Sequence, residues 1–360
     1  ALTTCAVSYV DWANHYPPGV EILDGVTLHR LPVDHPRDNE VFGRFNSGVA
    51  WGSKPVPLYL QNQWMQEQGP YVSGLTSWLE DHAADFDIVI FFTYLYFTTW
   101  AGLPAAAGRA PTVLHPTAHD EPPFQLPIFD IMFRMPRAFV FLTEEEGVLV
   151  RRRMNVLRPS RVIGVGVDLD VPTDADPASF RAAFNLGDRP YLLFLGRVVP
   201  DKGTSELFDF FTCYKQRNPG PLALVFVGEA VVPMPDHPDV VVTGFVDDNV
   251  RHDALAGALA LAQPSYFESF SMVLTEAWAH RRPALVQGRC AVLAGQARRS
   301  GGAIPYEGFA EFEAAVDMLM DDPRIGAKLG AAGRRYVEET YDWDVVLDSY
   351  EELLEEVVTQ

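Results

Sequence analysis

The chain has 360 residues, 48% of them hydrophobic, and a formal net charge of -20 at pH 7. A chain of this length exceeds what one hydrophobic core usually serves, so the sequence predicts two domains. The acidic balance argues against nucleic acid as a partner, because binding to phosphate backbones depends on clustered positive charge. The cysteines, Cys5, Cys213 and Cys290, lack disulfide or metal-ligand spacing and are predicted to be buried thiols in a reducing cytoplasm.

Short apolar strands alternate with segments of helical periodicity along the first half of the chain. Strands are predicted at 26–31, 87–92, 111–115, 138–142 and 162–165, and helices at 71–84 and 144–153. Residues 88–108 are uncharged and long enough to span a bilayer. Their threonines, glycine and proline favour a buried strand and then an aromatic helix from about Thr93, with a membrane helix as the alternative.

Two glycines and the acidic, proline-rich segment that follows them predict a hinge at about 164–177. Beyond it, strands are predicted at 191–195, 222–227, 240–242, 259–263 and 284–286, and helices at 204–216, 271–280, 309–320, 325–338 and 342–357. Near-continuous apolar strands predict parallel sheets covered on both faces by helices. We therefore expect an α/β fold of two Rossmann-like, doubly wound domains facing a cleft, residues 1–165 and 166–341. A last helix in 342–360 is expected to pack back on the first domain.

The first candidate site follows the predicted strand at 191–195. Arg197 comes directly after Gly196 at the end of this strand. Lys202 comes directly before Gly203, where the next helix begins. An arginine can bind phosphate oxygens in bidentate fashion, lysine supplies a compact positive charge, and a helix N-terminus adds N–H donors. The pattern predicts a cationic clamp for a diphosphate; the alternative is a surface turn with solvated cations.

The second candidate site is the loop and helix start after the predicted strand at 259–263. Glu268 lies on the loop, and Glu276 lies about one and a half turns into the helix. Carboxylates at this spacing can accept hydrogen bonds from sugar and ribose hydroxyls, and the unpaired N–H groups of the helix N-terminus face the same loop. The alternative is that Glu276 is an ordinary exposed helix residue and Glu268 a neighbour of the N-cap.

These motifs resemble those of the retaining GT-B glycosyltransferases, in particular glycosyltransferase family 4 (group 1). The resemblance covers about residues 163–343 and includes Gly196-Arg197, Lys202-Gly203, Gly244-Phe245-Val246, Glu268 with Glu276, Pro283 and Tyr341-Asp342-Trp343. It implies a nucleotide-sugar-binding domain at 166–341 and an acceptor-side domain at 1–165. It also implies that Arg197 and Lys202 bind the donor diphosphate, that Glu268 contacts the sugar, and that Glu276 contacts the ribose. The remaining donor-site residues implied are Gly196, Phe245, Ser269, Phe270, Ser271 and Met272.

The sequence departs from the family pattern where the family often has glycine. Ser271 stands at one such position and Arg281, two residues before Pro283, at another. Ser271 keeps its N–H group, so we expect anion binding there to survive. Residues 1–6 look like the end of a strand, and the family's first strand with its Gly-rich loop is not recognisable. We therefore expect a truncated chain that lacks its first strand–helix unit, with its activity in question.

In the first half, the resemblance points to a histidine near the reacting centre. His119 is the candidate, because it lies just past the strand at 111–115, whereas His115 is expected to face the sheet; a purely structural histidine is the alternative. Thr143 is a candidate for the same cleft, and residues 144–146 are expected to begin a helix, where acidic residues suit the dipole. An arginine-rich patch suits either a solvated helix end or a phosphorylated lipid or membrane surface: Arg151, Arg152, Arg153, Arg158 and Arg161.

The sequence thus predicts a metal-independent, retaining glycosyltransferase of the hexosyltransferase type, with His119, Arg197, Lys202 and Glu268 as catalytic candidates. It would move a sugar from a UDP-, GDP- or ADP-sugar to a carbohydrate, lipid-linked or small-molecule acceptor in polysaccharide or glycoconjugate synthesis. We expect a cytoplasmic location, with peripheral contact at the inner face of the membrane left open, and neither a cofactor nor a nucleic acid partner. The alternatives are a nucleotide-sugar-binding protein without catalysis and a nucleotide-sugar epimerase of the same fold.

Overall fold

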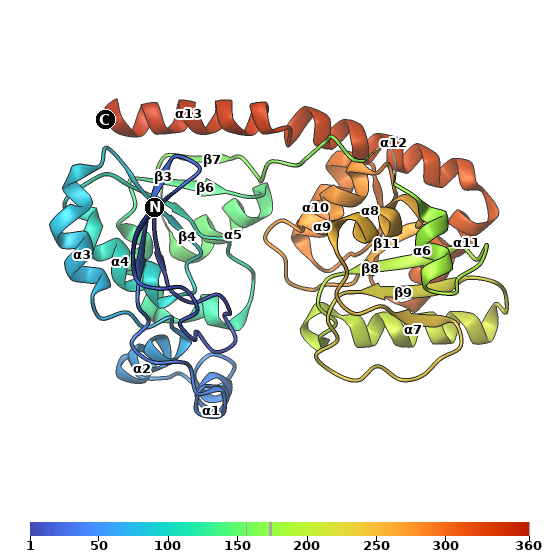
Figure 1. The fold of residues 1–360 in the computed structure, drawn as a ribbon, viewed down its shortest axis with the longest axis horizontal. Helices are drawn as coiled ribbons and strands as arrows, with labels where there is room; N and C mark the ends of the chain where they lie inside the picture. Colours follow the sequence, from blue (N-terminus) through green and yellow to red (C-terminus); the bar gives the residue numbers. More distant parts are fainter. Residues whose placement is uncertain (156, 173–174, 360) are drawn as a thin grey trace. The chain divides into compact units, whose positions relative to one another are not determined.

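The computed structural model of the protein describes residues 1–155, 157–172 and 175–359. It divides the chain into two compact units, unit 1 with Ala1–Ile163 and Ser349–Gln360, and unit 2 with Gly164–Asp348. In each unit, mainly parallel strands alternate with helices along the chain (Figure 1). The predicted α/β fold class is therefore confirmed.

Unit 1 contains two sheets. Strands β4 (Val89–Phe92), β5 (Thr112–His115), β6 (Ala138–Phe141) and β7 (Ser160–Val162) form a parallel sheet in that order. Strands β1 (Leu2–Thr4), β3 (Val26–Leu31) and β2 (Gly19–Leu23) form the other, in which β1 is parallel and β2 antiparallel to β3. The end strands β1 and β4 both line a groove of about 740 Å³.

The helices of unit 1 bury an aromatic core against its sheets. They are α1 (Asn39–Val49), α2 (Leu58–Gln68), α3 (Leu75–His82), α4 (Phe97–Ala107) and α5 (Glu144–Met154), with short 3-10 turns η1 (Ala83–Asp85), η2 (Pro122–Gln125), η3 (Pro127–Phe129) and η4 (Met132–Arg134). Trp64, Tyr94, Phe129 and Phe133 are almost fully buried in this core. Aromatic side chains of this size contribute much of the apolar area that stabilises a core.

Two predictions in unit 1 need correction, and one strand was missed. The strand expected at 162–165 is β7 at Ser160–Val162, because Gly164 has φ +82° and lies against the ring of Tyr341. The helix expected from about Thr93 begins at Phe97, since Thr93 itself adopts a left-handed φ of +66°. Strand β2 was not predicted at all. It pairs with β3 through the turn Asp24-Gly25, whose φ angles of +50° and +81° match the tight hairpin turn that such a dipeptide favours.

Unit 2 is built on a single parallel sheet in the order β10-β9-β8-β11-β12-β13. These strands are β8 (Tyr191–Leu195), β9 (Ala223–Val227), β10 (Val240–Val242), β11 (Ala260–Gln263), β12 (Ala284–Gln287) and β13 (Ala303–Tyr306). The accompanying helices are α6 (Pro177–Ala183), α7 (Thr204–Arg217), α8 (Asp248–Gly257), α9 (Met272–Ala279), α10 (Ala291–Ser300), α11 (Phe309–Asp321) and α12 (Pro323–Thr340), with the 3-10 turn η5 (Pro200–Lys202). The chain extends the sheet from β8 to β9 on one side and later to β11 on the other. The strand order therefore changes direction between β8 and β11.

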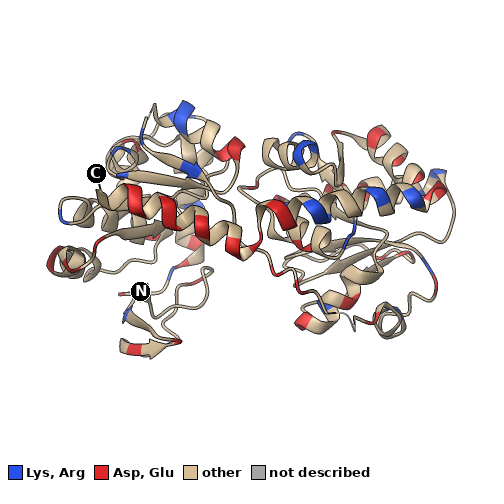
Figure 2. Cartoon of the chain, turned by 90° about the horizontal axis from the view of Figure 1, so that it is seen from above, with Lys and Arg blue, Asp and Glu red and all other residues tan. Residues whose placement is uncertain are grey.

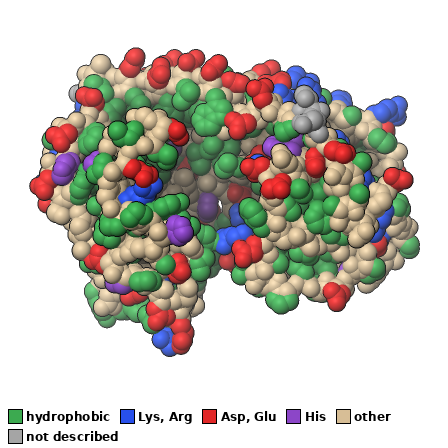
Figure 3. Space-filling model, in the orientation of Figure 1, with side chains coloured by type: hydrophobic (Ala, Val, Ile, Leu, Met, Phe, Trp, Pro, Cys, Tyr) green, Lys and Arg blue, Asp and Glu red, His purple; other side chains and the backbone are tan. Residues whose placement is uncertain are grey.

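The last helix, α13 (Trp343–Thr359), is strongly acidic, and acidic residues follow one another along it in Figure 2. Its carboxyl half belongs to unit 1. There the Arg161 guanidinium forms ion pairs with Glu352 and, at 2.5 Å, with Glu356. Acidic side chains are also spread over both units on the face seen in Figure 3, in keeping with the net charge of -20.

Most of the arginine-rich patch makes contacts within unit 1. Arg153 pairs with Asp130 at 3.0 Å, Arg158 donates to the carbonyl oxygen of Arg134 at 3.2 Å, and the Arg151 guanidinium lies 5.2 Å from the centre of a phenylalanine ring. Together with Arg161 of β7, which pairs with two glutamates of α13, these arginines contact the fold more closely than the predicted solvated helix end would. Contact with a membrane stays a prediction.

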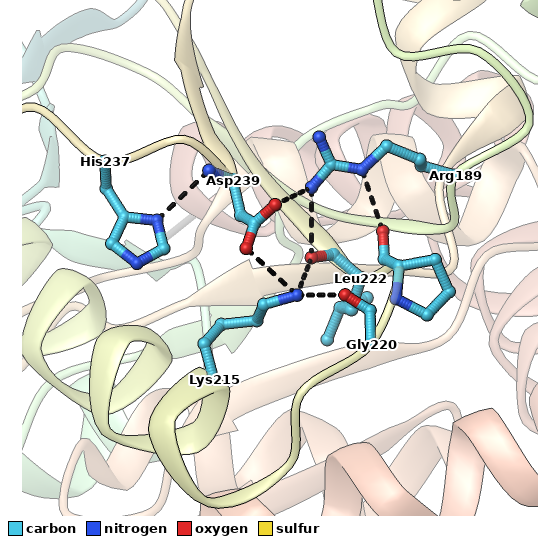
Figure 4. Close-up of polar contacts among 7 residues, drawn as sticks. Arg189, Lys215, Gly220, Leu222, His237 and Asp239 are labelled. Carbon is cyan, nitrogen blue, oxygen red and sulfur yellow. Dashed lines mark hydrogen bonds and ion pairs between the residues drawn. The ribbon is translucent and has the colours of Figure 1, made fainter.

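At the amino-terminal ends of β8, β9 and β10, one carboxylate holds two cations (Figure 4). Asp239, just before β10, pairs with Arg189 and, at 3.0 Å, with the Lys215 ammonium of α7. Lys215 also donates to the carbonyl oxygens of Gly220 and, at 3.1 Å, Leu222. This cluster ties helix α7 and the segments before three neighbouring strands together.

Candidate functional site

The change of strand order in unit 2 places two loops side by side. One leaves the carboxyl end of β8 and contains Arg197 and Lys202, and the other leaves the carboxyl end of β11 and contains Glu268. Because β8 and β11 are neighbouring parallel strands, their carboxyl ends meet at one edge of the sheet. Such a switch point is where open α/β sheets form ligand-binding crevices.

The side chains of Lys202 and Glu268 meet at this edge. The Lys202 ammonium lies 2.8 Å from Oε1 of Glu268. The Glu268 side chain is 10% exposed and that of Lys202 is 43% exposed. The amide nitrogen of Gln263, the last residue of β11, donates to Glu268 at 3.3 Å and to the Ser271 hydroxyl at 2.8 Å. The carboxylate is thus nearly buried and oriented, while the ammonium stays open to solvent and to a ligand.

Gly203 allows the two loops to approach this closely. It has a φ of +73°, and a Cβ at this position would clash with the carbonyl oxygen of Pro264 on the β11 loop. A larger residue would have to push the loops apart or unwind the start of α7. The glycine beside Lys202 is therefore required by the backbone, quite apart from any ligand.

Arg197 and Phe245 lie on neighbouring turns of the same sheet edge. Gly196 has a φ of +135°, its N–H donates to the carbonyl oxygen of Val227 at 2.9 Å, and Arg197, which follows it, is exposed. Phe245 follows Gly244 after β10 and is 88% exposed.

Glu276 has its own cation. Its Oε1 lies 2.6 Å from the Arg251 guanidinium of α8, and its Oε2 is buried with no hydrogen-bond partner among the described residues. The pocket there, of about 220 Å³, is also lined by His252 and His280, whose ring nitrogens lie 2.8 Å apart. Burial, with smaller contributions from neighbouring positive charges, lowers the pKa of His280 to about 4. The predicted donor-site carboxylates therefore do not share a cation: Glu268 pairs with Lys202, and Glu276 with Arg251.

The residues between the two glutamates form the beginning of α9. Phe270 is buried, and its carbonyl oxygen accepts a hydrogen bond from Gln296. Ser271 precedes the first helical residue, Met272, which is 57% exposed. Ser271 and Arg281 adopt left-handed φ angles of +74° and +57°. Glycine adopts this conformation without strain, which explains why a glycine would suit both positions.

The histidine candidates lie in unit 1, on and after β5. His115 is buried between the rings of Phe92 and Tyr350, at 4.6 Å and 5.3 Å, and burial lowers its pKa to about 4. His119 is partly exposed, and its Nδ1 lies 3.6 Å from Oε1 of Glu121. The choice of His119 over His115 stays a prediction, which the exposure of His119 favours.

Sequence reasoning missed Arg251 and Gln263 as partners of the two glutamates. Gln263 could have been found, because a glutamine at the end of an otherwise apolar strand points toward the carboxyl edge of the sheet. Arg251 carries no such signal in the sequence. Within the described residues, no helix has the length and apolar character to cross a membrane, and no three His, Cys, Asp or Glu side chains group as metal ligands.

Comparison with known proteins identifies this part of the chain. The family described as Glycosyl transferases group 1 matches residues 189–322. An alpha-D-kanosaminyltransferase of Streptomyces kanamyceticus is 26% identical over 180 residues, 44% of this chain and 44% of that protein. A D-inositol 3-phosphate glycosyltransferase of Frankia alni is 32% identical over 48% of each chain. A GDP-mannose-dependent alpha-(1-6)-phosphatidylinositol monomannoside mannosyltransferase of Mycobacterium tuberculosis is 29% identical over 51% of this chain and 52% of that protein. The chain spans about half the length of these relatives.

The fold is similar to that of solved glycosyltransferase structures. Sucrose-phosphate synthase of Thermosynechococcus elongatus has a TM-score of 0.69 at 17% identity, covering 95% of this chain and 86% of that one. Trehalose 6-phosphate synthase of Burkholderia multivorans has a TM-score of 0.73 at 12% identity, covering 99% and 91%. Anabaena HepE, solved in complex with UDP, has a TM-score of 0.67 at 14% identity, covering 83% and 89%. Residues 189–322 therefore belong to the group 1 glycosyl transferases, and the chain has the GT-B fold.

Proposed function

We propose that this chain transfers a glycosyl group from a nucleoside-diphosphate sugar to an acceptor hydroxyl, with retention of configuration and without a metal ion. The observation that carries the proposal is the pairing of Lys202 with Glu268 at the switch point of the unit 2 sheet, inside the segment that belongs to the group 1 family. The relatives named as kanosaminyl-, mannosyl- and inositol-phosphate glycosyltransferases support the reaction class. The HepE complex with UDP supports a nucleotide donor.

The chemistry assigned to Lys202 is electrostatic. Its ammonium has three donors, and Glu268 occupies one of them in the structure. The remaining donors, with the Arg197 guanidinium and the N–H groups at the start of α9, would neutralise the charge that develops on the departing diphosphate. Such preorganised charges are usually the largest single contribution to catalysis.

The two carboxylates would read different parts of the donor. Glu268, held by Lys202 and Gln263, would accept from a sugar hydroxyl, and the unpaired Oε2 of Glu276 would accept from a ribose hydroxyl. His119 belongs to the acceptor side in this proposal. A cytoplasmic location, peripheral membrane contact and a role in polysaccharide or glycoconjugate synthesis also belong to the proposal.

A thermal-shift panel with UDP-, GDP- and ADP-sugars tests donor binding, since a ligand that binds only the folded state raises its melting temperature. Lys202→Ala should remove the shift and lower transfer by at least about 100-fold. Lys328→Ala, which removes an exposed lysine from α12, is the matched control and should leave the shift and the rate unchanged. Near-normal turnover of Lys202→Ala would contradict the proposal.

Product analysis separates the two alternative functions. A binding protein without catalysis would give the thermal shift but neither transfer nor donor hydrolysis. An epimerase would convert the donor sugar in the absence of any acceptor.

A further inference from the structure

A buried glutamate in unit 1 has contacts that a helix start alone does not explain. Glu146 lies in the first turn of α5, and its side chain is 1% exposed. Its Oε1 accepts a hydrogen bond from the N–H of Ala118 at 2.7 Å, and its Oε2 accepts one from the N–H of Leu142 at 2.7 Å. One carboxylate thus joins the loop after β5 to the end of β6.

The Ala118 contact fixes the backbone directly before His119. Thr117, on the other side of Ala118, adopts a left-handed φ of +50°, and its hydroxyl lies 3.1 Å from that of Thr93, whose φ is +66°. Residues held in such conformations persist where the surroundings over-determine them, and they cluster at functional sites. The β5 loop is therefore held in one unusual conformation from two sides.

A second carboxylate completes the setting of His119. Glu121 Oε1 lies 3.6 Å from Nδ1 of His119 and accepts a hydrogen bond from the Tyr94 hydroxyl at 3.1 Å. Glu146 fixes the backbone before the histidine, and Glu121 lies against its ring. A partly exposed imidazole keeps a precise position only when other groups hold both its backbone and its ring.

We propose that Glu146 is a positioning residue, which holds the β5 loop through Ala118 and Leu142 and thereby places His119 for glycosyl transfer. The inference rests on the proposed function. Burial raises the pKa of Glu146 to about 7, and the amide contacts and the nearby His119 oppose this rise. Only the ionised carboxylate offers both oxygens purely as acceptors, which is the form that two N–H donors need.

Glu146→Gln is the direct test, because its amide nitrogen cannot accept a hydrogen bond. One of the two backbone N–H groups then faces a donor. We expect amide exchange at Ala118 or Leu142 to accelerate by at least tenfold. We also expect kcat for transfer to fall by about 10- to 100-fold, because a misplacement of about 1 Å at a reacting centre can cost about 100-fold. Donor affinity in the thermal-shift panel should stay unchanged, because the predicted donor residues lie in unit 2.

Glu144→Gln is the matched control, since Glu144 is an exposed acidic residue in the same first turn of α5. It should change neither amide exchange nor kcat. If Glu146→Gln does not fold, Glu146→Asp keeps the charge but withdraws the oxygens by one methylene, and should show the same faster exchange.

A double variant decides whether Glu146 acts through His119. In a His119→Ala background, Glu146→Gln should lower kcat by less than twofold. Additive losses, a His119→Ala enzyme with normal kcat, or unchanged exchange at Ala118 and Leu142 would each overturn the inference. Absence of both donor binding and transfer in the unaltered protein would instead defeat the proposed function, while the exchange measurement would still test the loop contact.

Discussion

Replacing Asp239 with Asn removes one charge from the cluster of Figure 4 with almost no change of shape. The carboxylate pairs with Arg189 and Lys215, and the Lys215 side chain is only 7% exposed. The Asp239 side chain is 25% exposed. The substitution leaves an almost buried ammonium without its counter-charge and turns an amide NH₂ toward one of the two cations.

The expected loss of stability depends on which contacts of the cluster remain in the variant. Breaking a buried ion pair by removing one partner typically costs about 3–5 kcal/mol. Here Lys215 keeps the carbonyl oxygens of Gly220 and Leu222, and Asp239 is partly hydrated, which moves the expected cost to about 2–3 kcal/mol. A Lys215→Met partner variant should show coupling in a double-mutant cycle, with a double variant less destabilised than the sum of the single ones.

Hydrogen exchange of the strand amides is the suitable assay, because a chain with two compact units need not unfold in one step. The N–H of Leu224 in β9 donates to the carbonyl oxygen of Asp239 at 2.9 Å and reports on this edge of the sheet. A loss of 2–3 kcal/mol corresponds to exchange faster by roughly 30- to 150-fold. Gln216→Ala, at the exposed position beside Lys215 on α7, should leave exchange unchanged.

The pH dependence has a defined sign. Burial raises the pKa of Asp239, but the hydrogen bond from Lys215 and the charges of Lys215 and Arg189 outweigh it, so the net pKa is lowered. The stabilisation is therefore fully present above the unfolded pKa of about 3.9 and is lost as the pH falls through the lower folded value. The difference in stability between the unaltered protein and Asp239→Asn should therefore disappear in that acid range. A gap below 0.5 kcal/mol at pH 7, or one that widens on acidification, would refute the reasoning.

Two further predictions concern backbone geometry in unit 2. Arg281→Gly should raise stability by about 1 kcal/mol, read as a higher melting temperature, because a side chain at φ +57° is strained, whereas Arg281→Ala keeps the Cβ and should bring no such gain. Gly203→Ala should lower stability by about 2 kcal/mol and weaken the donor-induced thermal shift, because its Cβ would clash with Pro264. Gly187→Ala is the control: Gly187 has a φ of +56° with nothing within 4 Å of a Cβ, so this substitution should cost only about 1 kcal/mol.

The arrangement of the donor-side residues was accessible from the sequence because parallel sheets obey strong rules. Lys202 and Glu268 each follow a strand that is nearly continuous in apolar residues, so both had to lie at the carboxyl edge of a sheet. Their 2.8 Å contact then depends on the two strands being neighbours and on Gly203, which lets the two loops approach. The roles assigned to them stay predictions until ligand binding is measured.

The partners of the buried charged side chains could not be predicted from the sequence in the same way. Glu146 has the sequence signature of an acidic helix start, and nothing in the sequence distinguishes it from the exposed Glu144 in the same turn. Arg251, which pairs with Glu276, lies on a helix 25 positions earlier in the chain. Asp239 forms ion pairs with cations from two different segments. Such contacts depend on side-chain packing between elements, which periodicity does not encode.

The acidic composition explains why each of these carboxylates has a cation or an amide beside it. In a chain with a net charge of -20, a carboxylate near a binding site repels the anionic ligand unless a cation or an amide compensates it. Glu268 and Glu276 each have a cation at hydrogen-bond distance, and Glu146 has two backbone amides instead. A diphosphate arriving at Lys202 would thus meet a locally neutralised carboxylate, and the half-exposed ammonium could serve both anions at once. Pairing Lys202 with Glu268 before the ligand arrives is therefore compatible with diphosphate binding, and it fixes the ammonium where the charge would develop.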